Sequence, residues 1–100
     1  MSASSHHQSP HLSVVVPVHN EEDNVAPLVG EIIKALRGLV DFEIVYVDDT
    51  SRDATLERLR ALQASTPELR VIRHLSNAGQ STAVRNGVKA ARAPWIATLD

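Results

Sequence analysis

Three apolar segments of this sequence are each followed by acidic residues. The acids are Glu21, the adjacent pair Asp48 and Asp49, and Asp100. Ionised carboxylates can accept hydrogen bonds from ribose hydroxyls or base N–H groups, hold a divalent cation beside phosphates, or act as a general base. If the apolar segments are parallel strands, their carboxyl ends share one edge of a sheet and the acids converge there. The spacing therefore predicts a site built from carboxylates.

The pair Asp48 and Asp49 also has a plainer interpretation. An Asp near a helix N-terminus is stabilised by the helix dipole, by about 0.3–1 kcal/mol. Helix initiation suits Asp53 well and Asp49 less well, because both precede a segment with helical spacing. It suits Asp48 poorly, because Asp48 directly follows the apolar run. Their placement favours a functional role for the pair, with helix initiation as the alternative.

Weaker candidates lie in the segments around these acids. His19 sits in the loop after the first apolar run and could transfer a proton, although a loop histidine is more often a bystander. Glu21, with Asn20, could instead cap the helix that follows. Gly79 permits a tight turn where the free N–H groups of a helix start could bind phosphate. Arg85 lies on that helix, and a lone helical arginine is usually solvated. Neither usual glycine-rich phosphate-binding pattern is present.

The segments that must position these residues alternate between strand-like and helix-like patterns. Nearly continuous apolar runs predict buried strands at residues 12–16 and 42–47, and further strands are predicted at 69–74 and 95–99. The arginines of 69–74 suggest that this strand has one exposed face or lies at an edge of the sheet. Apolar spacings of three and four predict helices at residues 23–39, between a cap at Thr50 or Ser51 and Pro67, and at 80–92. Helices between successive strands imply a parallel sheet with right-handed crossovers, so the predicted class is α/β.

Two residues inside the predicted helices set conditions on the fold. Pro27 is compatible with a helix only if it lies in the first turn. Gly87 lowers helix propensity by about 1 kcal/mol relative to Ala. A close approach to a neighbouring segment would be one reason to keep a glycine there.

Length and composition limit the possible functions. One hundred residues with 43% hydrophobic content suit one compact domain with a buried core. A formal net charge of -2, with acids and bases interspersed, argues against nucleic acid as a partner. Cysteine is absent, which excludes disulfides and a cysteine nucleophile, and no apolar stretch approaches the roughly 20 residues of a membrane helix. We expect residues 1–11 to form a disordered tail before a domain at 12–100.

Three blocks of the sequence resemble the N-terminal half of family 2 glycosyltransferases, sugar-nucleotide enzymes with a GT-A fold. V-V-V-P-V-H-N-E-E-D-N (14–24) resembles the family's strand-Pro-x-Tyr-Asn-Glu opening, with His19 in place of Tyr. V-D-D-T-S-R-D-A-T (47–55) resembles V-D-D-G-S-x-D-x-T. N-A-G-Q-S-T-A-V-R-N-G (77–87) and W-I-A-T-L-D (95–100) resemble the stretch that leads into the DXD motif. The residues of these blocks are most similar to the polyprenyl-phosphate, dolichol-phosphate mannosyltransferase-like branch of the family.

The resemblance implies a fold and a function. The fold would be a Rossmann-like three-layer parallel sheet with strand order 3-2-1-4, the N-terminal nucleotide-binding half of a GT-A fold. The function would be inverting transfer of a sugar from a GDP- or UDP-sugar to an acceptor such as polyprenyl or dolichyl phosphate. The residues implied to bind the nucleotide sugar are Pro17, His19, Glu21, Val47, Asp48, Asp49, Gly79, Arg85 and Asp100. Asp100, the first Asp of DXD, would also hold Mg²⁺ or Mn²⁺, which would act as a Lewis acid at the diphosphate.

The sequence departs from the family pattern at two places. Thr50 stands where the family usually has Gly, so a positive φ at this position would strain a β-branched residue. The sequence also stops at Asp100, so we expect a fragment that carries donor binding, contains no catalytic residue and is inactive alone. The parent protein is then expected in the cytoplasm or at the cytoplasmic face of the membrane.

Two other function classes remain open. A nucleotide-binding regulatory domain would keep the pocket and lack the chemistry. A receiver-like signalling domain also holds Mg²⁺ with paired Asp at a strand end. Against it, the pair follows the second strand rather than the first, and the third strand ends in His74-Leu75-Ser76 without a phosphoacceptor Asp.

Overall fold

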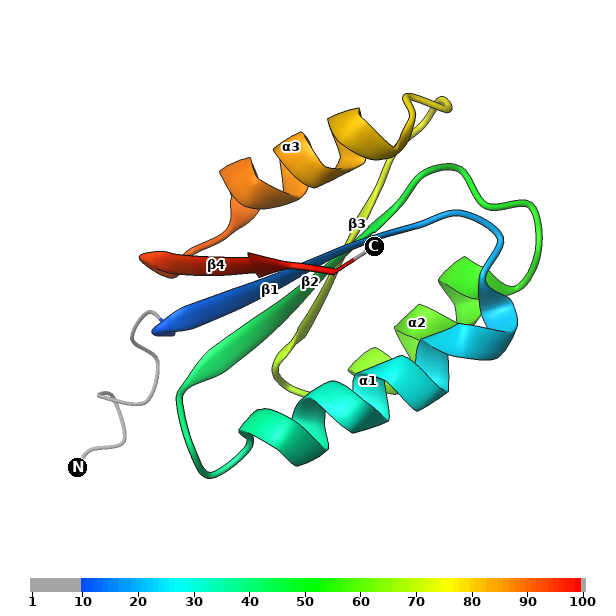
Figure 1. Cartoon of the computed structure of the whole chain (residues 1–100). Helices are drawn as coiled ribbons and strands as arrows, with labels where there is room; N and C mark the ends of the chain where they lie inside the picture. The colour runs from blue at the N-terminus through cyan, green and yellow to red at the C-terminus, as the bar shows by residue number, and fades with distance from the viewer. Residues whose placement is uncertain (1–9, 100) are drawn as a thin grey trace.

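The computed structural model describes residues 10–99, and it alternates strands and helices along the chain (Figure 1). The elements are β1 (Leu12–Val18), α1 (Glu22–Leu36), β2 (Phe42–Asp48), α2 (Thr55–Gln63), β3 (Leu69–Arg73), α3 (Gln80–Ala90) and β4 (Trp95–Thr98). This order confirms the predicted β-α-β-α-β-α-β pattern. Asp100 and most of the predicted N-terminal tail lie outside the described residues.

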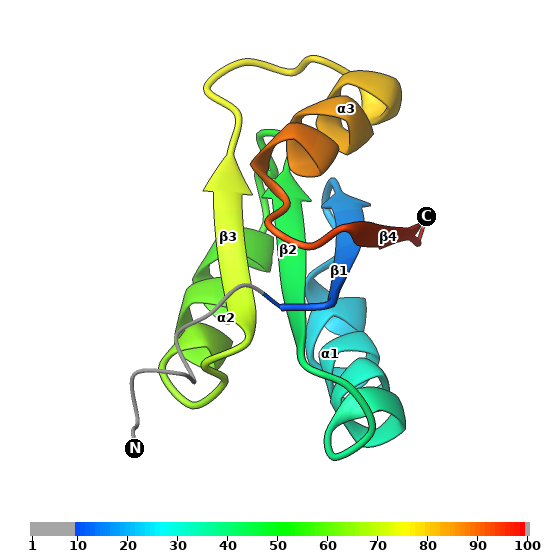
Figure 2. The same cartoon turned by 90° about the vertical axis from the view of Figure 1, so that its left-hand side faces the viewer.

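The four strands form one parallel sheet in the order β3-β2-β1-β4. Figure 2 shows β3, β2 and β1 side by side, with β4 beyond β1. The chain thus builds outward from β1 to β3 and then returns to the other side of β1, where the strand order reverses. Both the parallel sheet and the order implied by the resemblance are confirmed.

The sheet is covered on both faces, which explains the continuous apolar runs. Helices α1 and α2 lie on one face and α3 on the other (Figure 1). Because side chains alternate along a strand, Val14 and Val16 of β1 pack towards α1, and Val15 packs with Ala83 of α3. A strand buried on both faces needs apolar residues at every position.

Gly87 lets α3 lie close against the sheet. A Cβ atom at this position would lie 3.0 Å from Cγ2 of Val47 and would collide with the side chain of Val15. The predicted close approach is confirmed, and it is the reason that a helix interior tolerates the glycine.

Two predicted helix boundaries are wrong, and each has a local cause. The first helix ends at Leu36 instead of residue 39, because the chain turns at Gly38 with φ +90°. The second helix begins at Thr55, so neither Thr50 nor Ser51 caps it. Residues 49–54 instead form a loop that bonds to the loop before α1, as described below.

The condition placed on Pro27 is also wrong. Helix α1 begins at Glu22, so Pro27 lies in its second turn. Because proline has no N–H, the carbonyl of Asp23 loses its usual partner four residues later. Both residues are exposed, so water can bond to the freed carbonyl.

Candidate functional site

Three loops gather where the strands end, at the right-hand side of Figure 1. They are residues 19–21 after β1, 49–54 after β2 and 74–79 after β3. We call these loops, with Asp48 at the end of β2, the carboxyl rim. Since β1, β2 and β3 are adjacent and parallel, their following loops must meet at one edge of the sheet.

Asp48 has a buried carboxylate oxygen without a partner. The residue is 0% exposed, and its Oδ2 accepts one long hydrogen bond of 3.4 Å from the Ser51 N–H. Its Oδ1 contacts no donor among residues 10–99. A buried polar atom left unpaired costs about 1–3 kcal/mol, so this oxygen is suited to an outside donor. Helix initiation is not its role, because α2 begins only at Thr55.

Asp49 uses both carboxylate oxygens within the chain. Oδ1 accepts hydrogen bonds from the Ala78 N–H at 2.9 Å and from Nδ1 of His74 at 3.0 Å, and Oδ2 accepts from the Gly79 N–H at 2.9 Å. Burial would raise the pKa of Asp49, but the Ala78, His74 and Gly79 donors hold that pKa below its usual range. Asp49 therefore connects β2 to the loop that leads into α3.

The main-chain carbonyl of Asp49 connects the same residue to the first loop. It accepts hydrogen bonds from Nδ1 of His19 at 2.8 Å and from the Thr50 hydroxyl at 2.6 Å. The other ring nitrogen of His19 lies 3.2 Å from Nδ2 of Asn20. His19 thus holds the first two rim loops together.

Backbone strain is concentrated in these two loops. Thr50 has φ 55° and Asn20 has φ 54°, so the condition stated for Thr50 is met and its β-branched side chain is strained there. For a β-branched residue such as Thr50 this conformation costs about 1–3 kcal/mol, whereas Asn adopts it more readily, and strained residues of this kind cluster at functional sites. The strained residues are held by two cross-loop bonds of 2.8 Å, from the Asn20 N–H to Ser51 Oγ and from the Arg52 N–H to Asn20 Oδ1.

Asp53 lies just before α2, as the helix-initiation interpretation predicted for this residue. Its carboxylate accepts from the hydroxyl and the N–H of Thr55, which lower the pKa of Asp53, and from the Glu22 N–H at 3.3 Å. The Thr55 hydroxyl in turn accepts from the Glu21 N–H at 2.8 Å. Asp53 and Thr55 therefore join the starts of α1 and α2.

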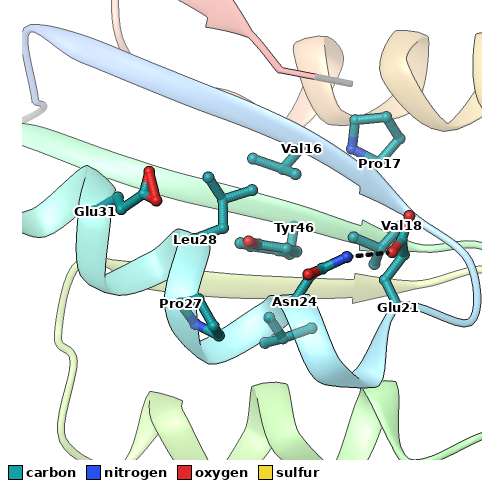
Figure 3. A pocket seen from close by; sticks show the side chains of 10 residues that line it. Val16, Pro17, Val18, Glu21, Asn24, Pro27, Leu28, Glu31 and Tyr46 are labelled. Carbon is teal, nitrogen blue, oxygen red and sulfur yellow. Dashed lines mark hydrogen bonds between the residues drawn. The ribbon is translucent and has the colours of Figure 1, made fainter.

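A cavity of about 300 Å³ opens beside the rim, between α1 and β1. Figure 3 shows Pro17, Glu21, Leu28 and Tyr46 around it, and Glu21 accepts a hydrogen bond of 2.9 Å from Nδ2 of Asn24. In the part of the chain that the structure describes, the buried Tyr46 hydroxyl has no partner. Burial, and then the charge of Glu21, raise the pKa of Tyr46, so its hydroxyl keeps its proton. The sequence pattern does not distinguish Tyr46 as a site residue, because Tyr46 occupies one more position of an apolar strand.

Of the remaining predicted site residues, Gly79 lies in a rim loop, whereas Val47 and Arg85 lie in β2 and α3. Val47 is fully buried in the core beneath α3, and Gly79, with φ +89°, directly precedes α3. Arg85 is exposed on α3, and Asp100 lies outside the described residues. The structure therefore brings His19, Glu21, Asp48, Asp49 and Gly79 together at the rim.

The described residues do not form a metal centre by themselves. Within residues 10–99, His, Asp and Glu side chains form no group of three that could hold a cation. The predicted metal ligand, Asp100, is not among these residues. In the same part of the chain, no helix is long and apolar enough to cross a membrane.

Relatives of known name match most of the chain. It is 40% identical over 95 residues to a dodecaprenyl-phosphate galacturonate synthase of Rhizobium johnstonii, covering 93% of this chain and 28% of the relative. It is 39% identical over 89 residues to a dolichol-phosphate mannosyltransferase of Pyrococcus furiosus, covering 89% and 25%. The chain thus spans only about a quarter of the length of these relatives.

Solved structures share the fold, and a family model shares the sequence pattern. Residues 1–349 of TarS from S. aureus in complex with UDP-GlcNAc superpose with a TM-score of 0.80 at 27% identity, covering 90% of this chain and 26% of TarS. The mannosyltransferase PcManGT of Pyrobaculum calidifontis, in complex with GDP-Man and Mn²⁺, gives a TM-score of 0.74 at 23% identity, covering 85% and 25%. Residues 13–100 match the family model "Glycosyl transferase family 2". The chain therefore belongs to glycosyl transferase family 2.

Proposed function

We propose that this chain is the nucleotide-sugar-binding part of an inverting glycosyltransferase that uses a GDP- or UDP-sugar. The observation that carries the proposal is the buried, unpartnered Oδ1 of Asp48 at the carboxyl rim. An ionised carboxylate is an acceptor only, so it suits an N–H of the base or a ribose hydroxyl. The UDP-GlcNAc bound to TarS supports the ligand class.

The rim residues have separate tasks in this proposal. Asp48 accepts a hydrogen bond from the nucleoside. His19 and Asp49 hold the surrounding loops in place. Pro17 and Glu21 lie at the neighbouring cavity and contribute to the base and ribose pocket. Bonds made in advance within the protein reduce the ordering needed when the ligand arrives.

A divalent cation, Mg²⁺ or Mn²⁺, completes the proposal. When bound, it would neutralise charge on the diphosphate of the donor. We assign Asp100 as its ligand on the resemblance of this residue to the first Asp of DXD. The chain's described residues contribute binding and positioning, and we propose that the 100-residue chain alone does not transfer sugar.

The acceptor that we propose for the whole protein is a polyprenyl phosphate. The support is the names of the relatives, which include a dodecaprenyl-phosphate galacturonate synthase and a dolichol-phosphate mannosyltransferase. A lipid-linked acceptor and a nucleotide-sugar donor meet at a membrane surface, so we place the whole protein at the cytoplasmic face.

Calorimetric titration of the chain with GDP, UDP and their sugars, with and without Mn²⁺, tests the proposal. We expect one nucleotide to bind, and Asp48→Ala to weaken it. A wild-type chain that binds none of them would reject donor binding. Binding of Mg²⁺ at the rim without any nucleotide would favour the receiver-like alternative. Nucleotide binding by a whole protein that transfers no sugar would favour the regulatory one.

A further inference from the structure

Asp49 makes contacts that reach all three loops of the carboxyl rim. It belongs to the second loop, its carbonyl accepts from His19 in the first, and its carboxylate accepts from the Ala78 and Gly79 N–H groups in the third. A shift of Asp49 would therefore move the loops on both sides of Asp48.

His74 provides the one side-chain donor among the three donors to the Asp49 carboxylate. Its Nδ1 lies 3.0 Å from Oδ1 of Asp49, and its Nε2 lies 2.9 Å from Nδ2 of Asn86 on α3. Its main-chain N–H also donates to the carbonyl of Asp48 at 2.9 Å. The side chains of His74 and Asp49 are only 11% and 7% exposed. The rigid ring thus joins the end of β3, the end of β2 and the body of α3.

The polar side-chain atoms of Asp49 and His74 all have partners within the chain, so none is left for a ligand. Both oxygens of Asp49 are engaged within the chain, and both ring nitrogens of His74 have partners. Asp48, the preceding residue, differs in having an oxygen free. The two adjacent acids therefore have different roles.

We propose that Asp49 and His74 are positioning residues of the nucleotide-sugar site, which fix the three rim loops around the free oxygen of Asp48. This inference rests on the proposed function. His74 acts through Asp49, and Asp49 acts through the backbone of residues 78–79 and through His19. Neither residue touches the nucleotide.

Two substitutions at His74 separate its bonds. His74→Leu removes both side-chain bonds, whereas His74→Asn places an amide donor near the position of Nδ1 and can keep the bond to Asp49. Glu43→Gln is the matched control, because Glu43 is another buried carboxylate with three donors, at the opposite end of the sheet. All variants are compared at a temperature where thermal melts show them folded.

The first readout is amide hydrogen exchange at Ala78 and Gly79, followed by NMR. We expect His74→Leu to speed exchange at both amides by about tenfold or more, and His74→Asn to restore most of the protection. The second readout is the calorimetric Kd for the nucleotide that the wild type binds. We expect about tenfold weaker binding for His74→Leu, largely rescued in His74→Asn, and a change within about twofold for Glu43→Gln.

The outcomes distinguish this inference from the proposed function. If His74→Leu exposes the two amides and leaves Kd unchanged, the contacts are structural and the positioning role is rejected. If Asp49→Asn weakens binding and His74→Leu does not, Asp49 touches the ligand directly, which also rejects the inference. If the wild type binds no nucleotide, the proposed function fails first and the positioning role fails with it, whatever the exchange shows.

Discussion

Both ends of the sheet contain buried carboxylates, which differ in how many hydrogen-bond partners they have within the chain. At the amino end, Glu43 accepts from the Ser13 hydroxyl at 2.6 Å, the Arg92 N–H at 2.7 Å and Nη1 of Arg70 at 2.8 Å. Arg70 also donates to the carbonyl of Ala90 at 2.9 Å, at the end of α3. Both oxygens of Glu43 are satisfied within the chain, and the group joins three strands to the last helix.

At the carboxyl rim, not every buried carboxylate oxygen has a partner within the described residues. It contains an unpartnered oxygen of Asp48 and two non-glycine residues with positive φ, Asn20 and Thr50. A fully bonded carboxylate contributes stability, whereas a free buried oxygen costs stability that a ligand can return. The comparison shows that two buried acids of one sheet can serve the fold at one end and binding at the other. Substitutions at the two ends should therefore separate stability from affinity.

The largest expected effect is at the amino end. Glu43→Ala removes an acceptor that Arg70, the Arg92 N–H and the Ser13 hydroxyl share. The Glu43 side chain is buried and that of Arg70 partly exposed, so breaking this ion pair should destabilise by about 3 kcal/mol, the lower end for buried pairs, and urea denaturation would measure this loss. At temperatures where the variant is folded, its nucleotide affinity should match the wild type. A large loss of affinity without a loss of stability would contradict the division between the ends.

At the rim, Asp48→Ala should have the reverse signature. Losing a hydrogen bond from the ligand to a charged acceptor should weaken nucleotide binding by about 1.5–3 kcal/mol. The free protein should unfold no more easily, and it is expected to gain stability, because a buried unpartnered oxygen disappears. Calorimetry and urea denaturation of the same preparation test both signs. A destabilised variant with unchanged affinity would assign Asp48 to the fold.

Acid should weaken the amino end and the third rim loop together. Burial would raise the pKa of Glu43, but hydrogen bonds from Ser13, the Arg92 N–H and Arg70 lower it, and Asp49 is likewise lowered. A carboxyl group whose pKa is lower when folded stabilises fully above its unfolded value of about 4, and the contribution is lost as pH falls through the folded value. Unfolding free energy should therefore decline from about pH 5 downwards, and less steeply in Glu43→Gln. An equal slope in the variant would contradict the role of Glu43.

The smallest effect should come from Thr50→Gly. Glycine adopts a positive φ without the steric cost of a β-branched side chain, which should stabilise the chain by about 1 kcal/mol. The loss of the bond from the Thr50 hydroxyl to the Asp49 carbonyl opposes part of this gain. A thermal melt would show a modest rise in Tm, with Ser51→Gly as a comparison at a neighbouring rim position. A fall in Tm would show that the hydroxyl bond outweighs the strain.

Much of the rim could be predicted because it follows from local pattern. The acids were expected at one edge because each follows an apolar run, and a parallel sheet brings such positions together. For Thr50, the family resemblance gave only a condition, because strain would arise if the position usually held by Gly required a positive φ. The bonding of Asp49 could not be predicted, because its donors at Ala78 and Gly79 lie about 30 residues further along the chain. The unpaired hydroxyl of Tyr46 could not be predicted either, because only the folded structure shows that no described residue offers it a hydrogen-bond partner.

The sequence by itself determined the alternation of strands and helices, the α/β class and the close contact at Gly87, because periodicity and side-chain size act locally. The strand order came from family resemblance. Only the tertiary structure decided which of two adjacent acids keeps a free oxygen. That difference depends on the path of the β3–α3 loop, whose N–H groups reach Asp49 and not Oδ1 of Asp48. Hydrogen bonds require donor and acceptor within about 3 Å, and only the folded chain brings such distant groups that close.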